Sequence, residues 1–151
     1  MNRFSFPTAM SAGPTVVFVL LASLIKWHFG YHPQMVLFVV GSALGLFLLE
    51  IAEGLFVQKQ SIFRTLITEM VFIPLSFFVI TSSTGLVGKG LVLAFLLRIL
   101  TEQVYEYRQT KKLSSWFSGT AFVQNQQTDF LIMIGGGVVF CIEAFLFLEV
   151  I

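Results

Sequence analysis

Apolar residues fill long runs of this chain, and polar residues gather in short breaks between the runs. Most runs are close to the ~20 residues that an α-helix needs to cross a bilayer. The pattern predicts an all-α fold, a polytopic bundle of five (alternatively four) membrane-spanning helices in a single domain of residues 1–151. The expected spans are about 14–31, 34–57, 62–80, 85–107 and 130–151, with one long connection at 108–129.

The composition favours the same class of protein. The chain is 56% hydrophobic and 11% charged, whereas soluble domains average about 45–50% and about 25%. A compact soluble domain of this composition would expose large apolar patches, which soluble monomers rarely do. The net charge of +1 excludes a strongly basic nucleic-acid-binding surface. The single cysteine, Cys141, excludes an internal disulfide, and its apolar neighbours predict a buried thiol.

The lysines and arginines predict the orientation, because cytoplasmic loops carry an excess of both residues. With five spans, the side that holds the N-terminus carries Arg3, Lys59, Arg64, Arg108, Lys111 and Lys112, and the opposite side carries Lys26 and Lys89. This excess favours a cytoplasmic N-terminus and an external C-terminus in a prokaryotic cytoplasmic membrane. The aromatic residues that follow Lys112 predict that about 113–123 lies on the cytoplasmic leaflet.

Charged side chains inside the spans are the candidate functional residues. A rise of about 1.5 Å per residue places four acids and two arginines from three spans near the cytoplasmic ends of their helices. A charge that faces hydrocarbon costs about 2.5–3.5 kcal/mol on insertion scales, so these side chains are expected to face one another, a wet cavity or a partner protein. The predicted buried charge cluster consists of Glu50, Glu53, Arg64, Glu69, Arg98 and Glu102.

Two further features complete the set of candidate residues. Glu143 falls in the external half at the depth of Lys89, which predicts a second ionisable site there. Gly41 and Gly45 form a small-x-x-x-small pattern, which lets two helices approach closely. That contact lies either within the bundle or between two copies of the chain.

The function of the charge cluster stays open at this point. Its two arginines neutralise two acids, and the remaining two carboxylates can hold protons, bind a cation or pair with a partner chain. In a purely structural role, the charges reach the interface by snorkelling and their pairs only tie helices together.

The stretch of about residues 41–107 resembles the small membrane-bound metal-dependent hydrolase-like proteins of the YdjM type. That family ends one helix with Leu-Pro-Asp-x-Asp-His, opens the next with His-Arg-x-x-Thr-His-Ser, and carries His-x-x-x-Asp late in a third. In this chain Arg64 matches, Glu50 and Glu102 replace aspartates, and Phe63, Thr68 and Arg98 stand where the family has histidines. The resemblance implies the helix arrangement, but the missing imidazoles argue against a bound transition metal.

The sequence favours a non-enzymatic accessory or scaffold protein, because it contains no recognisable nucleophile–base pair or competent metal site. We therefore expect no cofactor and no metal. The expected partners are the lipid bilayer and either another membrane protein or a second copy of the chain, and not nucleic acid. The alternatives are a proton- or cation-coupled small transporter and a degenerate membrane-bound metal-dependent hydrolase.

Overall fold

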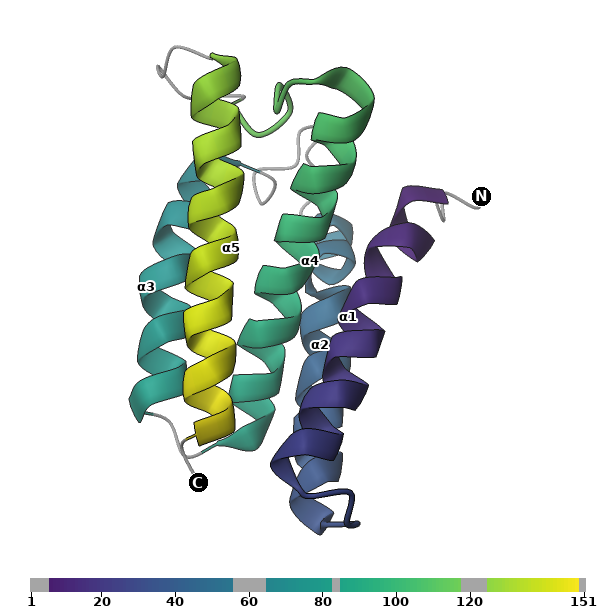
Figure 1. Cartoon of the computed structure of the whole chain (residues 1–151). Coiled ribbons are helices and arrows are strands. Elements are labelled where there is room, and N and C mark those ends of the chain that lie inside the picture. The colour runs from purple at the N-terminus through teal and green to yellow at the C-terminus, as the bar shows by residue number, and fades with distance from the viewer. Residues whose placement is uncertain (1–5, 56–64, 83–84, 118–124, 150–151) are drawn as a thin grey trace.

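Five α-helices, each antiparallel to the next along the chain, form the described part of the protein (Figure 1). The computed structural model describes residues 6–55, 65–82, 85–117 and 125–149. The helices are α1 (Phe6–Lys26), α2 (Pro33–Leu55), α3 (Leu66–Ser82), α4 (Leu86–Thr110) and α5 (Gln126–Glu149). No strand occurs in these ranges, so the all-α prediction is confirmed for them.

The first helix is displaced from the predicted span of 14–31. It begins at Phe6, so Pro14 lies inside the helix and not in its first turn. The helix ends at Lys26 because His28 and Phe29 adopt φ angles of 50° and 61°, which a right-handed helix does not allow.

The helices that flank the long connection are longer than predicted. α4 continues to Thr110 and is closed by Lys111, which has a φ of 57° and donates its backbone N–H to the Tyr107 carbonyl. α5 already begins at Gln126. The predicted start of the third span, at residue 62, lies outside the described residues.

The described start of the connection packs onto the helices. Leu113, Trp116 and Phe117 are buried in an apolar cluster with residues of α2, α3 and α4, and do not lie on the outside of the bundle. The backbone N–H of Leu66, at the start of α3, donates to the Trp116 carbonyl at 2.9 Å. This segment therefore closes one end of the bundle, because its aromatic rings are buried there against the helices.

The fourth helix is the centre of the bundle. α4 contacts each of the other four helices, and its buried residues are found on all sides of the helix axis along most of its length. Its closest neighbour is α2, because Gly41 and Gly45 leave no Cβ atom between the two backbones. A Cβ added at Gly45 would lie 2.2 Å from the Leu91 carbonyl oxygen, and one at Gly41 would lie 2.0 Å from that of Val87.

The outer surface of the bundle is apolar. Large hydrophobic side chains are exposed along α1, α2, α3 and α5, and examples are Val17 (56%), Val71 (66%) and Leu131 (66%). On α4, Val104 alone belongs to this group among the described residues. Cys141 is also exposed, which corrects the prediction of a buried thiol. Ile142 and Phe145 of α5 are exposed as well.

One helix of the described chain, α5, is both long and apolar enough to cross a membrane unaided. Shorter apolar segments lie in the three helices that precede α4, at Ala12–Lys26, Pro33–Leu49 and Leu66–Thr81. Charged residues interrupt the apolar sequence of α4, and two of them, Lys89 and Arg98, are buried.

The contact between α2 and α4 predicts a large effect of a single methyl group. Gly45→Ala should destabilise the protein by about 1–3 kcal/mol, because the added atom overlaps the α4 backbone. The matched control is Gly135→Ala, where a Cβ meets nothing within 4 Å and gains up to about 1 kcal/mol of helix propensity. Thermal unfolding of the purified variants measures both. Equal melting temperatures would contradict this contact.

Candidate functional site

The buried polar side chains of the described chain gather on α4 and on the helix faces that meet it. Arg98 and Gln103 are 1% and 0% exposed on α4, and Glu69, Ser76 and Glu143 are 3% exposed or less on α3 and α5. Buried polar groups are costly unless they find hydrogen-bond partners. The contacts of these buried polar side chains are therefore the evidence for their role.

Arg98 ties α4 to α2. Its Nε lies 3.3 Å from Oε1 of Glu102, one helical turn further along α4. Its Nη1 donates to the Leu46 carbonyl oxygen of α2. A guanidinium has five N–H donors and stays charged, so one side chain can satisfy a carboxylate on its own helix and a carbonyl on the next.

Glu69 ties α3 to α4 on a different side of the central helix. The Gln103 side-chain amide donates to Oε2 of Glu69 at 2.5 Å. Gly136 of α5 completes this level, because a Cβ there would lie 3.1 Å from Oε1 of Glu69 and 2.6 Å from Cδ2 of Leu100. The middle residue of the triple glycine thus leaves space for the carboxyl group between three helices.

Glu143 and Ser76 form a second polar level between α3 and α5. The Ser76 hydroxyl lies 2.7 Å from Oε1 of Glu143, and both residues are 0% exposed. Ser76 follows Glu69 by seven residues on α3, as Glu143 follows Gly136 on α5. Because α3 and α5 run in the same direction (Figure 1), the two levels lie about 10 Å apart along one interface.

Two lysines lie near the end of the bundle beyond Glu143. Lys26 of α1 donates to the Phe147 carbonyl oxygen of α5, and its Nζ is 4.4 Å from the centre of the Phe147 ring. Lys89 of α4 is 8% exposed. Among the described residues no ion pair joins Glu143 to either lysine, and its hydrogen bond goes to Ser76 instead.

Asp129 fixes the segment that closes the opposite end. It is 0% exposed in the first turn of α5, and its Oδ2 accepts the backbone N–H of Leu113 at 3.1 Å. An exposed hydrogen bond also holds this segment, in which Glu106 of α4 accepts the backbone N–H of Ser115 at 3.0 Å.

The described members of the predicted charge cluster make two separate contacts with neighbouring helices. Arg98 and Glu102 meet on the side of α2, whereas Glu69 meets Gln103 toward α3 and α5. Arg64 and the side chains of Glu50 and Glu53 lie outside what the structure describes. Glu143 and Lys89, the residues of the predicted second ionisable site, are both buried, and the hydrogen bond of Glu143 in the described chain is to Ser76.

Sequence reasoning missed three polar partners. Gln103 and Ser76 are uncharged, and the cost of burying a charge, which marks out the candidate residues in the sequence, does not mark out these two. Their signal was the seven-residue spacing of Glu69 and Ser76 and a glutamine next to Glu102. Asp129 was assigned to a loop, but it lies in the first turn of α5.

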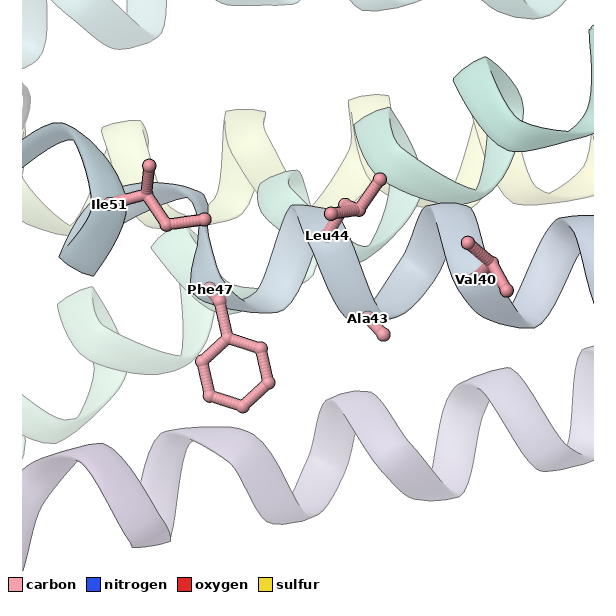
Figure 2. A pocket seen from close by; sticks show the side chains of 5 residues that line it. All are labelled: Val40, Ala43, Leu44, Phe47 and Ile51. Carbon is pink, nitrogen blue, oxygen red and sulfur yellow. The ribbon is translucent and has the colours of Figure 1, made fainter.

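A shallow hollow on α2 is apolar throughout. It is lined by Val40, Ala43, Leu44, Phe47 and Ile51, whose side chains follow one helix in Figure 2. These side chains offer no hydrogen-bonding group to orient a polar ligand. Within the described residues, no three histidine, cysteine, aspartate or glutamate side chains come together as metal ligands.

Comparisons with known proteins add no assignment. No family model matches the chain, and no curated protein and no solved structure matches it.

The Arg98 contacts predict a loss of stability when the guanidinium is removed. Arg98→Leu should destabilise the protein on the order of 3 kcal/mol, because it leaves Glu102 without its cation and breaks the link to α2. Arg108→Leu, an exposed position on the same helix, is the control and should change stability by less than ~0.5 kcal/mol. Chemical or thermal unfolding compares the two, and equal losses would show that Arg98 does not act through burial.

Proposed function

We propose that this chain is a polytopic integral membrane protein with a non-enzymatic accessory or scaffold role. The observation that carries the proposal is the use of the buried polar groups. Arg98, Glu69 and Glu143 each bond a residue of a neighbouring helix, as groups that hold a bundle together do. Polar groups buried between membrane helices stabilise the bundle in this way, because lipid offers them no alternative partner.

The apolar outer surface supports a lipid environment for this bundle. Side chains such as Val71 and Leu131 are two-thirds exposed on the outer helices, and a soluble monomer rarely leaves such a surface in water. α1, α2 and α3 contain apolar segments shorter than a full span. In our proposal they cross the bilayer together with α5 and enclose α4, whose charged residues would be costly if it faced lipid by itself.

The same apolar surface is where a partner would bind. A membrane protein with an accessory role needs a face that recognises another helix within the bilayer, and close packing provides most of that recognition. We propose that the partner is another membrane protein or a second copy of this chain, bound through the outer helices. The N-terminus is proposed to lie in the cytoplasm.

Cysteine accessibility tests the proposed topology. In a Cys141→Ala background, Tyr31→Cys and Lys112→Cys place one thiol at each end of the bundle, at exposed positions of the α1–α2 and α4–α5 connections. A membrane-impermeant thiol reagent should label Tyr31→Cys in intact cells and Lys112→Cys only after permeabilisation. Labelling of both from the same side would contradict the five-span arrangement, and the Cys141→Ala parent measures background labelling.

The same membranes test the accessory role. After gentle solubilisation, the Cys141→Ala parent should migrate in native electrophoresis as a discrete complex larger than one 16.9 kDa chain with its detergent. Migration as a single chain at all protein concentrations would contradict the role in an assembly and leave the topology result unaffected.

A further inference from the structure

Glu143 has an unusual position for a carboxyl group. It is completely buried, and its Oε2 has no hydrogen-bond partner in the described chain. Its Oε1 contacts the Ser76 hydroxyl at 2.7 Å. A carboxylate normally accepts several hydrogen bonds, so this site provides much less than an ionised group requires.

The single hydroxyl hydrogen of Ser76 bears on whether the carboxyl group of Glu143 is protonated. Ser76 Oγ lies 2.8 Å from the Ile73 carbonyl oxygen as well as 2.7 Å from Oε1 of Glu143. A serine hydroxyl has one hydrogen to donate and two lone pairs that accept. Serines within helices commonly donate to the carbonyl of the preceding turn. If Ser76 donates to Ile73, the contact with Glu143 is a hydrogen bond only when the carboxyl group carries the proton.

The charged groups described on the surrounding helices do not neutralise the charge that an ionised Glu143 would carry. On α3, Glu69 lies one polar level away and is bonded to Gln103 of α4. On α1, Lys26 reaches α5 at Phe147, one turn beyond Glu143. On α4, Lys89 is buried toward the same end. All the hydrogen bonds of Glu143 in the described chain go to Ser76, so no cation neutralises it there.

We propose that Glu143 and Ser76 form a proton-binding site, in which the neutral carboxyl group donates its hydrogen from Oε1 to Ser76 Oγ. A proton fits this site better than a metal cation, because one carboxyl group and one hydroxyl are too few ligands for Ca²⁺ or Mg²⁺, which take about six oxygen atoms or more. The proton removes the charge that burial makes costly. The site goes beyond a scaffold role, because release of the proton would place an unpaired charge between α3 and α5.

Infrared spectroscopy of the whole protein in lipid nanodiscs tests the site. At neutral pH the wild-type protein should show the C=O stretch of a protonated carboxyl group, and ¹³C-labelled glutamate should shift that band. Glu143→Gln should abolish the band, and Ser76→Ala should move it to higher frequency because a hydrogen bond is lost. The matched control is Glu149→Gln, an exposed position on the same helix, which should leave the band unchanged.

Each contrary result overturns the proposal. The absence of a band that Glu143→Gln removes would show that Glu143 is ionised, and an unchanged frequency in Ser76→Ala would exclude the serine as its partner. Loss of the band on addition of Na⁺ at constant pH would assign the site to a cation. If Glu143→Gln does not fold, the labelled wild-type protein and Ser76→Ala still decide the result. These outcomes are independent of the topology and assembly tests above.

Discussion

The burial of α4 is the constraint on which the rest of this structure depends. This helix carries Arg98, Gln103 and Lys89, and all three are at least nine-tenths buried. A helix with these residues cannot face hydrocarbon cheaply, and it cannot be enclosed unless its polar groups find partners. The other four helices enclose α4, because each of them contacts it. α2 supplies the Leu46 carbonyl oxygen that accepts from Arg98, and α3 supplies Glu69, which accepts from Gln103.

The polar interior of the described residues contains three contacts that each join two helices. Arg98 connects α4 with α2, Gln103 connects it with Glu69 of α3, and Glu143 connects α5 with Ser76 of α3. Close backbone packing accompanies these links at Gly45 and Gly136, where added side-chain atoms would overlap α4 or its side chains. Small residues thus bring helices near enough for short polar side chains to bridge them, a common arrangement in helix bundles that lack a hydrophobic driving force.

The sequence predicted the helices well and the polar partners poorly. Apolar runs gave the approximate position of all five helices, because hydrophobic patterning acts locally. The packing of Trp116 against the helices was not predicted, because its burial depends on a space that exists only when α2, α3 and α4 have assembled. The i,i+4 pair of Arg98 and Glu102 follows from helix geometry. The Glu143–Ser76 contact required the parallel register of α3 and α5, which no local pattern contains.

The direct test of the central claim is the transfer of magnetisation from lipid acyl chains to labelled methyl groups of the protein in nanodiscs. The account predicts strong transfer to exposed methyl groups of the outer helices, such as Val71 and Leu131, and none to Leu93, Leu96 and Ile99 of α4, which are 0% exposed. Transfer of equal strength to the methyl groups of α4, or transfer to Val71 and Leu131 from water in place of lipid, would contradict it.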